Sequence, residues 1–264
     1  MTNTTRQWQI YDALGWTVPI FAHIPLIHGP DGTKLSKRHG ALSIEAYRQK
    51  GYLPEAMQNY LLRLGWSHGD EEIISTNQAI KWFDLGSIGK SPAGFDIDKL
   101  NYLNAHYMRE TLNQDLVMLI SQILTDQGHQ IDETVKARLS RLMPQLKERA
   151  KTLLDIANNC NFLIARRPLS LTENAKKLLD CKIKEMLWEL SQELSTSDLW
   201  SVESLEASIR EFADKKAIKF GKVAQPLRAA LTGGQRSPGI FDVMTALGRE
   251  ESLGRIADQA AVET

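Results

Sequence analysis

Residues 51–67 read G-Y-L-P-E-A-M-Q-N-Y-L-L-R-L-G-W-S and predict one complete amphipathic helix. Pro54 suits its first position, because a helix leaves the N–H of that position without a partner in any case. Apolar residues recur at helical spacing and predict a stripe that faces a core: Met57, Tyr60, Leu61 and Leu64. Gly65 suits the end of the helix. The same pattern recurs along most of the chain, so this stretch sets the expected fold class as mainly α.

Helical patterns continue on both sides of this stretch, and further helices are expected at 5–14, 43–50, 76–83 and 98–109. From residue 113 onward more helices follow in series, over 113–126, 132–142, 144–160, 172–180, 182–194, 202–213, 222–231 and 238–248. Whether neighbouring segments fuse is open at this level. The sequence has no fixed-period repeat, so a compact helical bundle is expected instead of a solenoid.

A single segment alternates as a strand does. V-P-I-F-A-H-I-P-L-I at 18–27 places apolar side chains at every second position from Val18 to Leu26. Pro19 and Pro25 would keep such a strand short or at the edge of a sheet, because proline cannot donate to the hydrogen-bond ladder. The sequence therefore predicts one half-buried strand.

Composition limits the kind of protein. The 264 residues favour one or two domains. Lys plus Arg balance Asp plus Glu at 32 each, so no overall field draws the chain to a polyanion or a membrane. Cys160 and Cys181 lack metal-ligand or redox spacing, and the six histidines are too dispersed for a metal site. With no signal peptide and no apolar run of about 20 residues, we expect a cytoplasmic protein without membrane contact or protein-bound metal.

Charge is nevertheless uneven along the chain. Residues 136–151 hold six cations against Glu148 alone, and residues 210–236 hold seven cations against two acids. Two interpretations remain open for these basic segments. They suit a directional surface for a polyanion, and they also suit helix faces that water solvates and that bind no partner.

The segment H-G-P-D-G-T-K-L-S-K-R-H-G at 28–40 combines three glycines with Lys34, Lys37 and Arg38. Glycines allow close approach of the backbone to an anion and movement between open and closed positions. Lysine ammonium groups act as movable point charges against phosphate, and arginine adds forked hydrogen bonds. The P-loop pattern is absent. Composition alone leaves open a phosphate-binding loop and a charged surface turn.

K-L-S-K-R at 34–38, between P-D-G-T and H-G-A, resembles the KMSKS signature of the class I aminoacyl-tRNA synthetases in its glutamyl form. Four further blocks resemble that family in the same order: 51–67, 90–104, 223–233 and 237–244. The resemblance implies an ATP-binding loop made of Lys34, Leu35, Ser36, Lys37 and Arg38. It assigns to Lys37 the catalytic stabilisation of charge on the triphosphate, with Lys34 as a supporting cation and Ser36 organising the loop.

The resemblance also implies the organisation of the chain. Residues 1–45 would be a C-terminal remnant of a Rossmann-type catalytic domain, 46–112 a stem-contacting helical region, and 113–264 an all-helical anticodon-binding domain with two lobes split near residue 195. The family's other ATP signature, His-Ile-Gly-His, does not occur in this sequence. We therefore expect the C-terminal portion of a bacterial glutamate–tRNA ligase, and we expect the 264 residues alone not to form glutamyl-adenylate. ATP–pyrophosphate exchange by the purified chain would contradict that expectation.

The helical second half resembles the bacterial glutamyl enzymes, whereas glutaminyl relatives of the eukaryotic kind read the anticodon with β-barrels. By position, Arg149 matches an arginine that reads the third anticodon base, and the alternative is an ion pair with Glu148 or Asp155. Arg228 and Thr232 are further candidates for anticodon contacts. For Arg228 the alternative is a buried structural cation.

The function implied is a glutamate–tRNA ligase, with tRNA(Glu), ATP with Mg²⁺, and glutamate as partners of the complete enzyme, and a monomer is expected. Two alternatives belong to other classes. One is a non-catalytic tRNA-binding protein derived from such a synthetase. The other is a helical scaffold whose basic faces bind no RNA.

Overall fold

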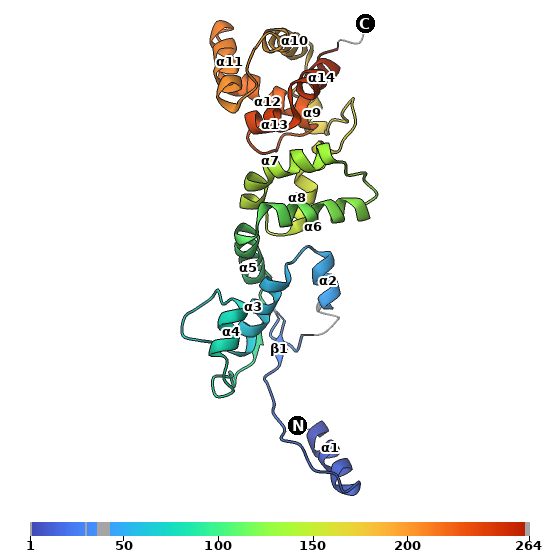
Figure 1. Cartoon of the computed structure of the whole chain (residues 1–264), viewed down its shortest axis with the longest axis vertical. Coiled ribbons are helices and arrows are strands. Elements are labelled where there is room, and N and C mark those ends of the chain that lie inside the picture. The colour runs from blue at the N-terminus through green and yellow to red at the C-terminus, as the bar shows by residue number, and fades with distance from the viewer. Residues whose placement is uncertain (1, 30, 36–42, 262–264) are drawn as a thin grey trace. The chain divides into compact units, whose positions relative to one another are not determined.

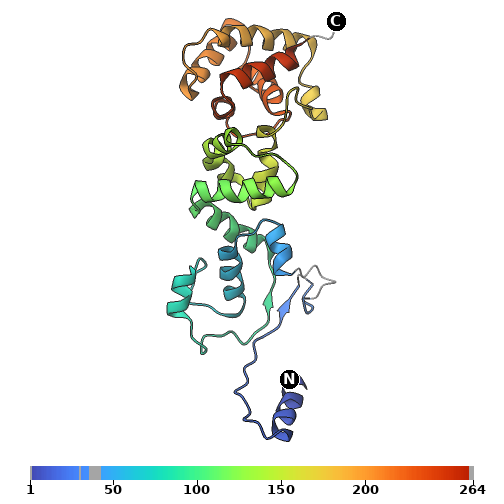
Figure 2. The same ribbon diagram turned by 45° about the vertical axis from the view of Figure 1, so that its right-hand side comes forward.

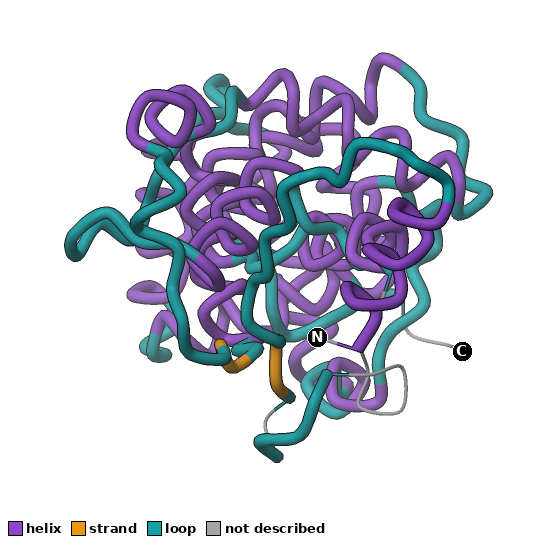
Figure 3. The backbone as a smooth tube through the Cα atoms, turned by 90° about the horizontal axis from the view of Figure 1, so that it is seen from below, coloured by secondary structure: helices purple, strands orange, loops and turns teal. Residues whose placement is uncertain are grey.

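The computed structural model describes residues 2–29, 31–35 and 43–261. Helices dominate these ranges, and strand is confined to one short pair (Figure 3). The chain forms two compact units, one made of Met1–Ile44 with Pro54–Leu100 and the other of Glu45–Leu53 with Asn101–Thr264. Figures 1 and 2 show the elements of both units. The expected mainly α fold is confirmed.

In its described residues, the first unit contains three whole helices, one pair of strands and the start of α5 (Ile97–Glu110). The whole helices and the strands are α1 (Thr2–Ala13), β1 (Ile27–His28), α3 (Pro54–Gly65), α4 (Thr76–Trp82) and β2 (Ala93–Gly94). The two strands pair in parallel, with Ile27 opposite Ala93 and His28 opposite Gly94.

The strand expected over 18–27 is largely wrong, because residues 16–26 run without regular structure and only Ile27–His28 pairs. Alternating apolar residues make a strand only where a partner satisfies the backbone, and among the described residues such partners reach only the end of this segment, from β2 and from Leu35 N–H. Ile20 in the unpaired stretch is fully exposed.

The helix read from residues 51–67 is present as α3, and its apolar stripe packs in part as predicted. Tyr60 is buried, and its hydroxyl oxygen accepts a hydrogen bond of 2.6 Å from the backbone N–H of Asp96. Leu61, by contrast, is exposed. Asp96 caps α5 by accepting from the backbone N–H of Asp98 at 2.9 Å.

The second unit is all helical in the residues that the structure describes. Its earlier elements are most of α2 (Ile44–Gln49), the larger part of α5, then α6 (Asn113–Asp126), α7 (Glu133–Arg149) and α8 (Leu153–Asn159). A 3₁₀ turn, Asn161–Leu163, leads to the later elements α9 (Glu173–Lys176), α10 (Cys181–Ser195), α11 (Val202–Lys215), α12 (Phe220–Thr232), α13 (Ile240–Leu247) and α14 (Arg249–Ala260). Helix α7 packs against α6 and α13, and α14 packs against α10 and α12.

Two boundaries in this unit differ from the prediction. The segment expected over 144–160 is divided: its first part continues α7 through Pro144 to Arg149, which answers the open question of fusion with 132–142, and its second part is α8. A proline inside a helix costs about 3 kcal/mol, and the burial of Leu142, Met143 and Leu146 on the inward face offsets that cost. Helix α14 was not predicted as a separate element.

A buried arginine links several elements in the later part of this unit by hydrogen bonds. The Arg255 side chain on α14 is 1% exposed and donates to the carbonyls of Phe162 at 2.9 Å and Leu231 at 2.8 Å. Its Nε also donates to Glu251 at 2.6 Å. Burial lowers the pKa of Arg255, and these partners stabilise the charge. Arg255 thereby fixes the end of α12, the helix that carries Arg228.

Candidate nucleic-acid interface

A pocket of about 400 Å³ opens between the end of α7 and the segment that leads into α13. Its lining comes from α7, α8, α12 and residues 235–238: Gln145, Leu146, Arg149, Asn159, Arg228, Gln235, Arg236, Ser237 and Pro238. Three of these residues are arginines, and no carboxylate occurs among the described residues of the lining. An unbalanced group of guanidinium forks favours a ligand with phosphate or with acceptor atoms on planar bases.

Arg228 is held in place from within the pocket wall. Its Nε donates to Ser237 Oγ at 2.9 Å, and that hydroxyl donates to the carbonyl of Pro238 at 2.8 Å. Burial, with a smaller contribution from the charge of Arg149, lowers the pKa of Arg228. Two guanidinium groups therefore face the same space, and an anionic or acceptor-rich ligand would relieve their repulsion.

Arg149, the last residue of α7, is exposed and points its charge into this pocket lining. In the residues that the structure describes, Arg149 forms no ion pair with Asp155, and Oδ2 of that carboxylate accepts from the backbone N–H groups of Lys151 and Thr152, each at 2.9 Å. Glu148 makes no ion pair with Arg149 either, and no other carboxylate of the described residues does. The guanidinium of Arg149 therefore keeps its donors available for a ligand.

Thr232, the third predicted contact, closes α12. Its hydroxyl donates to the carbonyl of Arg228 at 2.8 Å, and Gly233 follows with a φ of 73°. Thr232 does not line the pocket, and its anticodon contact stays a prediction.

Several residues that line the pocket were not predicted from the sequence as site residues. Ser237 directly precedes the helix expected over 238–248, whereas α13 begins at Ile240 and Ser237 accepts from Arg228. Gln145, Asn159, Gln235 and Arg236 also line the pocket without having been predicted. For Arg236 the sequence did give a signal, its place in the basic segment 210–236.

The basic segment 136–151 is mostly engaged inside the protein. Lys136 pairs with Glu133 at 2.7 Å. Lys147 donates to the carbonyls of Arg109 at 2.7 Å and Thr111 at 3.0 Å. Arg138 and Arg141 donate to carbonyls at the end of α13. These side chains therefore mainly join α7 to neighbouring elements. Arg149 is the arginine of the segment that faces the pocket.

The second basic segment, 210–236, is engaged in a similar way. Arg210 pairs with Glu206 at 2.7 Å, Lys215 pairs with Glu193 at 2.8 Å, and Lys216 pairs with Glu189. These exposed pairs contribute little stability, but they neutralise the local charge. Of the other four cations of the segment, Arg228 and Arg236 line the pocket, and Lys219 and Lys222 are exposed.

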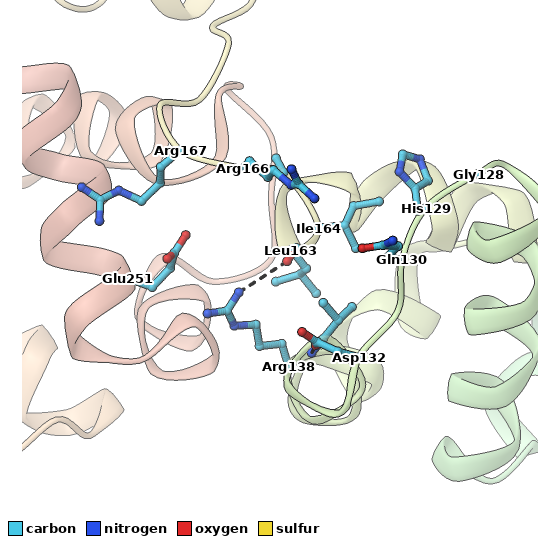
Figure 4. A pocket seen from close by; sticks show the side chains of 12 residues that line it. Gly128, His129, Gln130, Asp132, Arg138, Leu163, Ile164, Arg166, Arg167 and Glu251 are labelled. Atoms are coloured by element: carbon cyan, nitrogen blue, oxygen red, sulfur yellow. Dashed lines mark hydrogen bonds between the residues drawn. The ribbon is translucent and has the colours of Figure 1, made fainter.

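A larger cavity of about 630 Å³ lies at the opposite end of α7 (Figure 4). Its charges are mixed and largely paired. Arg167 binds Asp258 at 2.7 Å, Glu251 binds Arg255, and the Asp132 carboxylate caps α7 by accepting from Val135 N–H at 2.8 Å. This cavity is therefore a less favourable site for an anion than the pocket at Arg149 and Arg228.

The glycine-rich loop is described only in its first part. Gly29 N–H donates to the carbonyl of Thr33 at 2.8 Å, and Leu35 N–H donates to that of Ile27 at 2.8 Å. These bonds form a narrow turn that brings Lys34 opposite His28. Ser36, Lys37 and Arg38 lie outside the described residues, so their predicted roles stay predictions.

The described residues contain no group of three or more His, Cys, Asp or Glu side chains placed to hold a metal ion. Within the same ranges, no helix has the length and apolar content needed to cross a bilayer.

Two family models match the chain. Residues 1–102 match the catalytic domain of the class I tRNA synthetases (E and Q), and residues 111–260 match an anticodon binding domain. The pocket at Arg149 and Arg228 lies wholly within the second match.

Curated relatives agree with the family models. Glutamate–tRNA ligase 2 of Parvibaculum lavamentivorans is 55% identical over 262 residues, which are 99% of this chain and 54% of the relative. Glutamate–tRNA ligase 1 of a Methylobacterium species is 55% identical over 98% of this chain and 56% of the relative. The chain thus spans about half the length of the curated relatives it matches.

Among solved structures, a glutamate tRNA ligase from Elizabethkingia meningosepticum, crystallised with its amino acid, superposes with a TM-score of 0.81. It is 32% identical and covers 98% of this chain, which corresponds to 55% of that protein. The chain belongs to the class I aminoacyl-tRNA synthetase family, in its glutamyl branch.

Proposed function

We propose that this chain provides the KMSKS-type loop and the anticodon-binding surface of a glutamate–tRNA ligase, which joins glutamate to tRNA(Glu) with ATP. The observation that carries the proposal is the pocket of Arg149, Arg228 and Arg236, which contains no carboxylate among its described lining residues. It lies within residues 111–260, which match an anticodon binding domain.

The chemistry of the pocket suits unstacked bases. Arginine offers a planar fork that forms two parallel hydrogen bonds with the edge of a base, and such a pair discriminates against the wrong base by about 1–3 kcal/mol. Because Ser237 holds Arg228, less conformational freedom is lost when a ligand binds. Arg149 is exposed at the end of its helix and is assigned the third anticodon base; Thr232 and Arg228 are assigned further anticodon contacts.

At the other functional site, the loop of residues 34–38 is assigned to ATP. Lys37 would stabilise the negative charge that develops on the triphosphate, with Lys34 in support and Ser36 and Arg38 shaping the loop. Mg²⁺ would accompany ATP as part of the substrate. This assignment rests on the match of residues 1–102 to the catalytic domain and on the resemblance of the loop.

The domain organisation proposed with this function has three parts: a catalytic portion over 1–45, a stem-contacting region over 46–112 and the anticodon-binding domain over 113–264, with two lobes. The end of one family match at residue 102 and the start of the other at 111 support the boundary between the second and third parts. The complete enzyme is proposed to act in the cytoplasm as a monomer.

The test is binding of tRNA(Glu) and tRNA(Gln) transcripts by the purified chain and by its Arg149→Gln variant. Loss of a fork to one base predicts that affinity for tRNA(Glu) falls by about tenfold or more, while affinity for tRNA(Gln) changes little. Arg210→Gln is the matched control, because it removes an exposed arginine of the same unit that already pairs with Glu206.

Two results would overturn parts of this proposal. An equal loss on both transcripts would mean that Arg149 anchors phosphate and does not discriminate. If the unaltered chain binds neither transcript, or binds without the salt dependence that phosphate contacts require, the anticodon-binding function itself is wrong.

A further inference from the structure

Helix α13 is held at both of its ends by one helix, α7. At its beginning, the backbone N–H of Gly239 donates to Gln145 Oε1 at 3.1 Å. At its end, Arg141 donates to the carbonyl of Thr245 at 2.8 Å and Arg138 donates to that of Leu247 at 3.4 Å. Since the later residue of α7 contacts the beginning of α13 and the earlier residues contact its end, the two helices run antiparallel.

The residues that make these contacts share a face with the proposed reader of the anticodon. Arg138, Arg141, Gln145 and Arg149 are spaced by three, four and four residues. That spacing places all four along one side of α7. The side that carries Arg149 is therefore also the side that holds α13.

These contacts supply what α13 lacks. Its N-cap residue, Gly239, has no side chain to accept from the first N–H groups, and Gln145 provides an acceptor. At the other end, two guanidinium groups lie against carbonyls of the last turn, where a helix carries partial negative charge. Figure 4 shows Arg138 reaching across from α7, where it also donates to the carbonyl of Leu163 at 3.5 Å.

The position of α13 decides the shape of the pocket. Ser237 and Pro238 line the pocket and directly precede Gly239, so a shift of α13 along α7 carries them with it. It would also move the Ser237 hydroxyl, which holds Arg228 by accepting a hydrogen bond from its Nε at 2.9 Å. The distance between Arg149 and the opposite wall thus depends on contacts made at the far end of α13.

We propose that Arg141 is a positioning residue for anticodon recognition, which acts by fixing α13 against α7 and does not touch RNA. The inference rests on the function proposed above. Arg141 does not line the pocket, and its guanidinium meets Thr245 at the end of α13 farther from Gly239. Since it is exposed, the competing role is a direct phosphate contact, and the two roles predict different measurements.

The experiment measures the affinity of the full chain for two RNA hairpins, one with the tRNA(Glu) anticodon and one with its third base replaced, over a range of salt concentrations. Arg141→Met keeps the length of the side chain and removes its charge and donors. A positioning residue predicts that the affinity ratio between the hairpins falls by about fivefold to tenfold, as expected for the loss of a charge-assisted hydrogen bond. The salt dependence of binding should stay unchanged, and Arg141→Lys should restore part of the ratio.

A double variant tests whether Arg141 acts through Arg149. In an Arg149→Gln background, Arg141→Met should cause no further loss of discrimination, because residues that act through the same contact are not additive. If Arg141→Met unfolds the chain, Arg138→Met tests the same claim at Leu247, the neighbouring carbonyl of α13.

Each contrary result has its own meaning. An equal loss of affinity for both hairpins, with a salt dependence smaller by about one phosphate contact, would identify Arg141 as a phosphate anchor and overturn the inference. An unchanged affinity ratio in the variant would also overturn it while leaving the proposed function intact. Failure of the unaltered chain to distinguish the hairpins would count against the proposed function itself.

Discussion

At the scale of the residue, the pocket is defined by what its arginines lack. Arg149 and Arg228 face each other without a carboxylate among the described lining residues, and burial together with this neighbour lowers the pKa of Arg228. Elsewhere in the same unit the arginines Arg167, Arg210 and Arg255 all have acidic partners. Acidic partners thus hold these three arginines within the fold, whereas Arg149 and Arg228 have none in the pocket.

Residue type and position predicted two of the pocket residues and could not predict the rest. Arg149 and Arg228 stood out because charged residues in blocks that resemble an anticodon-binding domain suggest a contact. The bond between Arg228 and Ser237 joins residues on either side of a turn whose course the sequence does not reveal. The neighbourhood of Arg149 and Pro238 depends on the packing of α7 against α13, which is a tertiary property.

The ion pair between Asp258 and Arg167 predicts a dependence of stability on pH. Hydrogen bonding from Arg167 holds the pKa of Asp258 below its usual range, and two oxygens accept at 2.7 and 2.8 Å. A lowered pKa in the folded state gives stability that is present above the unfolded value of about 4 and is lost as pH falls through the folded value. Because both side chains are partly exposed, the contribution is about 1 kcal/mol at most.

Asp258→Asn should therefore lower the free energy of unfolding at pH 7 and should match the unaltered chain at about pH 2. Urea unfolding at a series of pH values measures the difference. Asp198→Asn is the control, since it neutralises an exposed aspartate of the same unit. A difference that persisted undiminished in acid would show that Asp258 acts through its shape instead of its charge.

At the scale of the element, helices were predicted well because each carries its own hydrogen bonds and its own apolar stripe. Helix α6 begins and ends at the residues expected from the pattern, 113 and 126. The strand at 18–27 was predicted poorly because a strand needs a partner that local pattern does not supply. Packing also decides the course of the chain at Pro144, where the burial of Leu142 and Leu146 outweighs the local preference of proline and α7 continues.

Within the second unit, one side chain joins elements that are far apart in the sequence. Asn104 on α5 is fully buried, accepts from Leu53 N–H at 2.8 Å, and donates to the carbonyl of Lys151 at 2.7 Å. Beside it, Leu153 N–H donates to the carbonyl of Gly51 at 2.9 Å. These bonds hold residues 51–53 against the turn that follows α7.

Asn104→Ala should lower the free energy of unfolding by about 2–3 kcal/mol, because a buried N–H and a buried carbonyl would both lose their partner. Urea denaturation followed by circular dichroism measures the change. Asn158→Ala is the matched control, since that asparagine is exposed on α8. Equal stability of the two variants would mean that water satisfies the groups that Asn104 binds.

At the scale of the whole chain, positive and negative charges are equal in number, but the cations differ in whether they have a partner. The 32 cations and 32 acids give no net charge, and several cations of the two basic segments, among them Lys136, Arg141, Lys147 and Lys215, are engaged with carboxylates or carbonyls. The sequence could show where cations are concentrated, but not which of them have partners. Membership in the glutamyl branch of the synthetases was predictable, because it depends on ordered blocks along the chain and not on contacts between them.

The central claim is that the anticodon enters the pocket of Arg149, Arg228 and Arg236. The most direct measurement is zero-length photocrosslinking of the tRNA(Glu) anticodon hairpin, with 4-thiouridine placed in turn at each anticodon position, to the purified chain, followed by mass spectrometry of the linked peptides. We predict crosslinks within the segments 145–159 and 228–238, which contain the residues that line the pocket. Crosslinks confined to the cavity at His129 and Arg166, or spread over the paired basic surface, would contradict the claim.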